Sequence, residues 1–207
     1  MQTVLIALLA YGLGSVSFAI VVSRLMALPD PRSYGSKNPG ATNVLRSGSK
    51  IAAALTLVGD SGKGWLAAWL AWRYTADLDV TAIAGLAAFV GHLFPVFYRF
   101  QGGKGVATAA GVLFALDWRI GAGTLATFII IVFFLRYVSL AAIVAAIFAP
   151  LAAAFLLGLG VPAAAVLVMA VLLVWRHRAN ISRLIAGTES RLGAKKPEPS
   201  PPPPSGA

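Results

Sequence analysis

Residues 137–175 read YVSLAAIVAAIFAPLAAAFLLGLGVPAAAVLVMAVLLVW and include no charged side chain. This run is about twice as long as the roughly 20 residues that cross a bilayer once as an α-helix. Gly158, Gly160 and Pro162 interrupt it, which predicts two apolar helices joined by a short turn. The segment therefore indicates an integral membrane protein of the helical class.

Further apolar runs occupy most of the remaining chain. The other candidate spans are residues 3–23, 51–72, 80–98, 105–116 and 120–135. Two of them are weaker, because 51–72 contains Asp60 and Lys63, and 105–116 reaches only about 18 Å as a helix. We predict an all-α, polytopic membrane protein with about seven transmembrane helices, and five is the conservative alternative.

The composition agrees with a membrane protein. Of the 207 residues, 58% are hydrophobic and 12% are charged, and the mean hydropathy is +0.81. A soluble domain has roughly one-quarter charged residues. The net charge of +10 is explained by cytoplasmic loops rich in lysine and arginine that face anionic headgroups. Nucleic acid is not expected as a partner, because the sequence has no soluble basic domain. The absence of cysteine from the sequence excludes disulfides and thiolate chemistry.

The basic residues also predict an orientation. Arginines and lysines crowd the first loop, 24–50, and the segment 176–196, so both are predicted to be cytoplasmic, with the N-terminus outside. The first apolar run lacks a basic leader and is interpreted as a retained span. Residues 1–193 are predicted to form one transmembrane domain, and the proline-rich residues 194–207 a disordered cytoplasmic tail.

The first polar motif lies in the loop from Gly35 to Gly48. Asn38-Pro39-Gly40 predicts a turn, and a short helix from Ala41 to Arg46 is expected to follow. The segment concentrates a hydroxyl, two cations and two amides, a combination suited to binding an oxyanion. The alternative is an ordinary interfacial loop.

The second motif is QGGKGVAT at residues 101–108. Its glycines allow backbone N–H groups to approach a phosphate, Lys104 adds a positive charge, and the following helix adds its N-terminal end. A Walker A loop is excluded, because Tyr98 stands where that pattern needs glycine and Gly105 where it needs Ser or Thr. The alternative is a flexible interfacial hinge.

The third motif is WRHRANISRL at residues 175–184, followed by GTE at 187–189. His177 and Asn180 are three residues apart on the predicted helix and share one face. A basic amphipathic helix on the lipid headgroups accounts for the arginines, but less well for this pair. His177 is a candidate base or phosphate ligand, with a helix-surface residue as the alternative.

Other polar residues have plain explanations beside functional ones. Asp60 and Lys63 are spaced to pair on one helix face, either as part of a functional site or as a tolerated ion pair. Ser139 is either a ligand of substrate or a hydroxyl bonded to its own helix backbone. His92 is interpreted as structural. The sequence includes neither a Gly-x-Ser-x-Gly elbow nor a His-Glu-x-x-His zinc pattern, and no metal is expected.

The three motifs together resemble the bacterial acyl-phosphate:glycerol-3-phosphate acyltransferase family of the PlsY type. The residues that carry the resemblance are DPRSYGS at 30–36 with NPGATN at 38–43, GHLFP at 91–95 with GGKG at 102–105, and HRANISRL at 177–184 with Glu189. The resemblance covers roughly residues 3–192 in order and spacing.

This resemblance implies transfer of an acyl group from acyl phosphate to the 1-hydroxyl of glycerol 3-phosphate, without a cofactor. It places the protein in the bacterial inner membrane, with its active site facing the cytoplasm and a functional link to the enzyme that supplies acyl phosphate. The catalytic assignments are Ser36, Arg46, Lys104, His177 and Asn180. The substrate-binding assignments are Asn43, Gly102, Gly103, Gly105 and Ser139, and Glu189 is assigned to the architecture of the site.

Two other functions fit parts of the sequence. A transporter of an organic phosphate also needs many spans and an anion site, but transporters place that site near the midplane, between paired repeats. Here the polar motifs gather at one predicted face, and only Asp60 and Lys63 lie deep. A non-enzymatic membrane scaffold has no need of three phosphate-competent motifs on one side.

Overall fold

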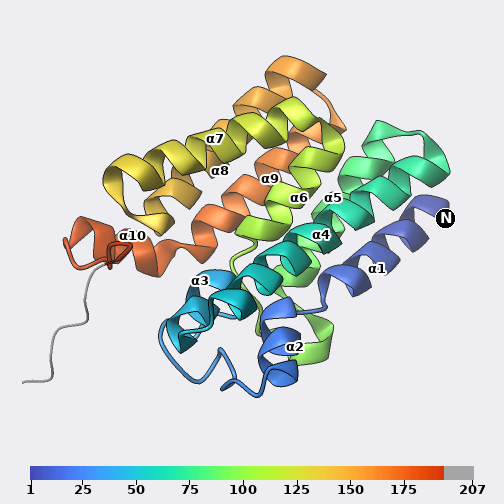
Figure 1. Ribbon diagram of the computed structural model, residues 1–207. Helices are drawn as coiled ribbons and strands as arrows, with labels where there is room; N and C mark the ends of the chain where they lie inside the picture. Colours follow the sequence, from blue (N-terminus) through green and yellow to red (C-terminus); the bar gives the residue numbers. More distant parts are fainter. Residues whose placement is uncertain (194–207) are drawn as a thin grey trace, which may run out of the picture.

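The computed structural model describes residues 1–193, which form a helical bundle without strands in that range (Figure 1). Its helices are α1 (Gln2–Gly14), α2 (Phe18–Leu25), α3 (Ala41–Val44), α4 (Lys50–Thr75), α5 (Leu78–Leu93), α6 (Val106–Leu116), α7 (Trp118–Leu135), α8 (Val138–Leu157), α9 (Val161–Arg176) and α10 (Arg178–Ile185), with the 3₁₀ turns η1 (Leu45–Ser47) and η2 (Val96–Tyr98). The proline-rich tail predicted at 194–207 lies outside the described residues.

Four segments of the described chain are long and apolar enough to cross a bilayer, and the bent pair α9–α10 makes a fifth if it is one span. The four are Gln2–Leu25, Leu78–Tyr98, Trp118–Leu135 and Val138–Leu157. The 26-residue α4 is not among them and carries Asp60 and Lys63, while α6 has only 11 residues. The predicted total of seven spans and the predicted orientation remain predictions.

The outer surface of the bundle is apolar, as expected when lipid is the solvent. Along α7, Ile120 and Gly121 are the buried residues, and side chains such as Phe133 and Phe134 project outward. Inside, small residues let helix backbones approach closely: a Cβ added to Gly111 of α6 would lie 1.9 Å from the Ser61 carbonyl oxygen of α4. Close packing through glycine and alanine is how helices associate where the hydrophobic effect gives no preference for protein over lipid.

The three polar motifs occupy breaks between helices. In the first loop the predicted short helix is confirmed as α3 followed by η1. The Gly-rich motif lies between α5, which ends before Pro95, and α6, which begins after Gly105 in the left-handed region at φ +84°. At the third motif the chain bends by 57° from α9 into α10. The predicted break at residues 158–160 is confirmed between α8 and α9.

Candidate functional site

The first loop is held together by the side-chain amide of Asn43. Its Oδ1 accepts the Ser36 N–H at 3.0 Å, and its Nδ2 donates to the carbonyl oxygens of Pro31 at 2.6 Å and Tyr34 at 3.2 Å. Asn43 is buried, whereas Ser36 is exposed. The structure thus gives Asn43 a clear task in shaping the loop that presents Ser36, and direct binding of substrate by Asn43 remains a prediction.

The Gly-rich loop is clamped between α5 and α9. Arg176 donates from Nη2 to the Gly102 carbonyl oxygen at 2.7 Å and from Nε to that of Gly103 at 3.1 Å. On the other side, the Gly103 N–H donates to the His92 carbonyl oxygen at 3.1 Å. The clamp turns the loop carbonyls toward Arg176 and leaves Lys104 to extend toward α10.

Glu189 is the centre of the polar network around Lys104. Its Oε1 accepts from the Ser139 hydroxyl at 2.7 Å and from Asn180 Nδ2 at 2.6 Å, and its Oε2 accepts from Arg183 Nε at 2.6 Å. Asn180 Oδ1 accepts in turn from Lys104 Nζ. Lysine only donates and carboxylate only accepts, so the Asn180 amide has a single favourable orientation. The alternative that Ser139 bonds its own helix backbone is wrong, because Glu189 offers a charged acceptor within reach.

Arg46 connects the first loop to this network. Its Nη2 donates to Ser190 Oγ at 3.4 Å, and its side chain lies against Gly35, beside Ser36. The first loop also touches the Gly-rich loop, since a Cβ built on Gly103 would lie 3.0 Å from the Pro39 carbonyl oxygen. Residues from all three motifs therefore meet at one end of the bundle, where Figure 1 shows α3 and α10 away from the N-terminus.

His177 stands at the bend between α9 and α10 and is buried. Its Nδ1 lies 2.8 Å from the Leu173 carbonyl oxygen, which identifies Nδ1–H as the donor, because a carbonyl only accepts. Within residues 1–193 the Nε2 atom makes no hydrogen bond. A neutral imidazole with Nδ1 protonated offers the Nε2 lone pair as a base or as a hydrogen-bond acceptor.

The site is electropositive. The charges of Arg46, Arg176, Arg183 and Glu189 all act on the ammonium group of Lys104. These five groups, four cations and one carboxylate, carry a net charge of +3. Burial, reinforced by the three arginines and opposed by Glu189, lowers the pKa of Lys104 to about 8. Burial raises the pKa of Glu189, but hydrogen bonds from Ser139, Asn180 and Arg183 outweigh it and leave that pKa lowered. An anion of two or three charges would complete this arrangement.

The pKa of Lys104 predicts how anion binding changes with pH. The ammonium group is protonated below about pH 8 and loses its charge above it. We expect the KM for a phosphate-bearing substrate to rise above pH 8, by up to about tenfold per pH unit. The measurement is the KM at a series of pH values for wild type and Lys104→Arg. Arginine stays charged, so the KM of Lys104→Arg is expected to be independent of pH in this range. If the KM of both proteins rose in parallel, Lys104 would not be the group that titrates.

Glu189 gives a second prediction. Glu189→Ala removes the acceptor of three donors, so we expect a loss of about 2–3 kcal/mol in stability and roughly a tenfold loss of activity. Glu189→Gln keeps one carbonyl oxygen for Ser139 and Asn180 and is expected to lie between the two. Thermal unfolding in detergent and initial rates measure both effects. Asp79→Ala, an exposed acid on α5, is the control; equal behaviour of Glu189→Ala and this control would refute the role.

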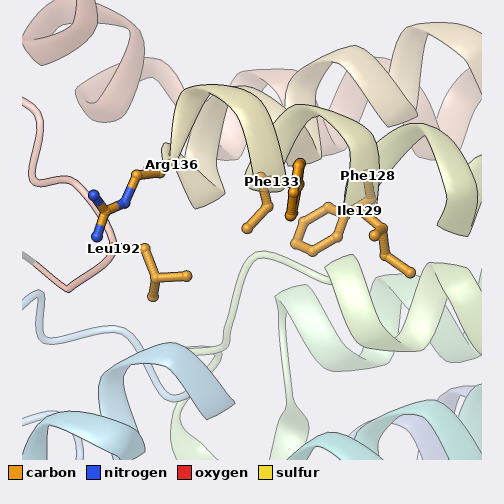
Figure 2. A pocket seen from close by; sticks show the side chains of 6 residues that line it. Phe128, Ile129, Phe133, Arg136 and Leu192 are labelled. Atoms are coloured by element: carbon orange, nitrogen blue, oxygen red, sulfur yellow. The ribbon is translucent and has the colours of Figure 1, made fainter.

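A groove of about 370 Å³ runs along α7 from the edge of the polar network (Figure 2). Arg136 and Leu192 lie at one end, and the Leu192 N–H donates to the Arg136 carbonyl oxygen at 2.7 Å. Leu192 follows Glu189 by three residues, so this end of the groove adjoins the cations. The apolar walls continue along the helix through Phe133, Val132, Ile129 and Phe128.

A model of the family described as glycerol-3-phosphate acyltransferase matches residues 4–187 of this chain. The chain belongs to the glycerol-3-phosphate acyltransferase family. A family member from Paraburkholderia phymatum is 61% identical over 200 residues, which cover 95% of each chain. Another, from Burkholderia multivorans, is 64% identical over 198 residues, covering 95% of this chain and 93% of the relative. Both bear the name glycerol-3-phosphate acyltransferase.

Two crystal structures of a solved glycerol-3-phosphate acyltransferase share the fold. Both are of PlsY (YgiH), an integral membrane glycerol 3-phosphate acyltransferase. The glycerol 3-phosphate form matches with a TM-score of 0.87 at 39% identity, and the lysophosphatidic acid form with 0.85 at 38%. Each match covers 93% of this chain and 96% of the solved chain. The expected PlsY-type family and helical membrane fold are therefore confirmed.

The sequence interpretation missed two contributors to this candidate site. Arg176 and Arg183 were attributed to lipid headgroups, but Arg176 clamps the Gly-rich loop and Arg183 pairs with Glu189 at 2.6 Å. One signal was available for Arg183: it follows Asn180 by three residues on α10, so a role for Asn180 implied a shared face. The predicted continuous helix through Arg176 and His177 is wrong, because the chain bends by 57° between α9 and α10. Among the described residues, no group of three or more His, Cys, Asp or Glu side chains is arranged to hold a metal.

Proposed function

We propose that the protein transfers a fatty acyl group from acyl phosphate to the 1-hydroxyl of glycerol 3-phosphate, giving 1-acylglycerol 3-phosphate and phosphate. The observation that carries this proposal is the electropositive site, with a net charge of +3, beside an apolar groove. Family members carry the name of this acylation, and the related solved protein has forms named for glycerol 3-phosphate and lysophosphatidic acid. Both molecules combine a phosphate with a glycerol backbone, which the cations suit.

The site supplies the parts that this reaction needs. An acyl phosphate is a mixed anhydride with a stable leaving group, so positioning and anion stabilisation matter more than a strong nucleophile. Lys104, Arg46 and the N–H groups of the Gly-rich loop other than that of Gly103, which donates to the His92 carbonyl oxygen, bind the two phosphates. The arginines and lysines of the first loop and of the segment 176–193 favour a site at the cytoplasmic face of the inner membrane.

In the proposed mechanism the substrate hydroxyl attacks the acyl carbon directly. The new ester C–O bond forms as the bond from the acyl carbon to the phosphate oxygen breaks, and the phosphate leaves with the electron pair. The hydroxyl proton passes to Nε2 of His177 or to an oxygen of a substrate phosphate. Ser36 then contributes a hydrogen bond and forms no ester. An acyl-Ser36 adduct trapped by rapid quench and detected by mass spectrometry would exclude direct attack.

The deciding experiment uses purified protein in detergent or bicelles. It is supplied with glycerol 3-phosphate and synthetic palmitoyl phosphate, and lysophosphatidate is measured by mass spectrometry, with palmitoyl-CoA as a parallel donor. We expect product from the acyl phosphate alone. Product from palmitoyl-CoA alone would overturn the donor assignment. Uptake of glycerol 3-phosphate into proteoliposomes without any product would instead favour a transporter.

The groove on α7 is proposed to hold the acyl tail. Val132→Trp places a larger side chain in its wall, so we expect kcat/KM for palmitoyl phosphate to fall about tenfold while that for butyryl phosphate changes little. The control is Ile130→Trp, which is exposed on α7 outside the groove. Equal losses for both donors, or equal effects of the two variants, would argue against the groove as the tail site.

A further inference from the structure

A second polar cluster lies inside the bundle and provides none of the side chains that face the proposed substrates. Asp60 and Lys63 come from α4, His92 from α5 and Thr108 from α6, and none is more than 6% exposed. Ionisable groups at membrane depth are costly, so their presence points to a task. The mechanism described above uses none of these four side chains.

Asp60 and Thr108 both approach Nδ1 of His92, and Lys63 pairs with Asp60. The carboxylate of Asp60 lies 2.9 Å from Lys63 Nζ and 3.6 Å from His92 Nδ1, and the Thr108 hydroxyl lies 3.1 Å from the same nitrogen. A negative charge beside Nδ1 favours the tautomer that carries its proton there. The Thr108 oxygen then accepts that N–H, and the imidazole ring is held in one orientation.

The opposite edge of the ring supports the Gly-rich loop. A Cβ added to Gly103 would lie 2.2 Å from His92 Nε2, so the imidazole is in direct contact with the loop backbone. The His92 carbonyl oxygen accepts the Gly103 N–H, and a Cβ on Gly102 would lie 2.1 Å from that oxygen. His92 thus supports the loop with its backbone and its side chain, opposite the clamp from Arg176.

We propose that Asp60, His92 and Thr108 are positioning residues that set the Gly102–Gly103 backbone for the phosphate of glycerol 3-phosphate. Lys63 neutralises Asp60 so that this carboxylate remains charged inside the membrane. The inference rests on the proposed function, because it requires the loop to bind the acceptor's phosphate. The three side chains act through the loop and touch no substrate.

A purely structural role for the ion pair makes a different prediction. Lys63 Nζ donates to the Val16 carbonyl oxygen at 2.6 Å, and the Phe18 N–H donates to Asp60 at 3.4 Å. These bonds satisfy backbone groups at the break between α1 and α2. If the pair served only that break, its loss would lower the unfolding temperature and leave the KM for glycerol 3-phosphate unchanged.

Two double variants separate these roles. Asp60→Leu/Lys63→Met and Asp60→Asn/Lys63→Met both remove the two charges together, which avoids a lone buried charge. Only the asparagine variant keeps an oxygen beside His92 Nδ1. We expect the leucine variant to raise the KM for glycerol 3-phosphate about tenfold and the asparagine variant to stay within about threefold of wild type. The KM for acyl phosphate should change in neither, nor in the control Ser61→Ala, whose hydroxyl bonds its own helix at Leu57.

A third variant tests the cluster with both charges in place. Thr108→Val removes only the hydroxyl beside Nδ1 and is expected to raise the same KM several-fold. Binding is measured independently from the rise in unfolding temperature when glycerol 3-phosphate is added. An unchanged KM in Thr108→Val and in any folded leucine variant, with an active wild type, would overturn the positioning role alone. A wild type that neither binds nor acylates glycerol 3-phosphate would overturn the proposed function as well.

Discussion

Replacing Lys104 by methionine is expected to lower kcat/KM for glycerol 3-phosphate by about 10²–10³-fold, the range seen when one preorganised donor to a developing anion is removed. Lys104 is the partly buried cation of the Gly-rich loop and donates to Asn180. Its pKa is altered by the charges of three arginines and Glu189. Methionine has similar length but no charge, so the loop and Asn180 remain while the charge-assisted bond to phosphate is lost.

The controls for this variant distinguish lost charge from lost folding. Lys50→Met removes an exposed cation at the start of α4 and is expected to leave kcat/KM unchanged. Lys104→Arg restores a charge with a different shape and is expected to recover part of the activity. Steady-state rates over both substrates, with unfolding temperatures, make the measurement. Wild-type kcat/KM in a folded Lys104→Met protein would remove Lys104 from the site.

Adding a single methyl group at Gly103 is also expected to cause a large loss of activity. In Gly103→Ala the new Cβ would lie 2.2 Å from His92 Nε2 and 3.0 Å from the Pro39 carbonyl oxygen. Neither neighbour has room to move, since His92 is buried and Pro39 belongs to the packed first loop. The loop itself must shift, and a displacement of about 1 Å at a catalytic element costs on the order of 100-fold in rate.

The matched control for this substitution is Gly62→Ala, because a Cβ there meets nothing within 4 Å. We expect Gly62→Ala to retain wild-type kinetics, since alanine also favours the α4 helix. Gly103→Ala should keep an unfolding temperature within a few degrees of wild type while losing activity, which separates a displaced loop from a collapsed bundle. Near-normal activity in Gly103→Ala would mean that the close fit of this loop does not matter.

Several features were predictable because they depend on local sequence. The uncharged run 137–175 and its break at Gly158–Gly160 predict α8 and α9, and the turn at Asn38–Gly40 predicts α3. Apolar side chains and glycine breaks act over a few residues, so they can be interpreted without knowing the fold. The Gly-rich loop before a helix was recognisable for the same reason.

Other features depend on residues that are distant in the chain. Glu189 accepts from Ser139, 50 positions away, and Arg176 donates to a loop more than 70 positions earlier. A basic helix at the headgroups and a helix that clamps a loop have the same local pattern. The same is true of the Asp60 and Lys63 pair, whose spacing predicts a contact with each other but not with His92 of the next helix.

By itself, then, the order of residues determined a helical membrane protein with three anion-suited motifs at the ends of helices, because hydropathy and turn chemistry are properties of short segments. Tertiary structure alone decided that these motifs form one electropositive site, that Glu189 accepts hydrogen bonds from Ser139, Asn180 and Arg183, and that His92 contacts the Gly-rich loop. The physical reason is that helix packing, through close contacts such as Gly111 against Ser61, selects which distant helix ends become neighbours.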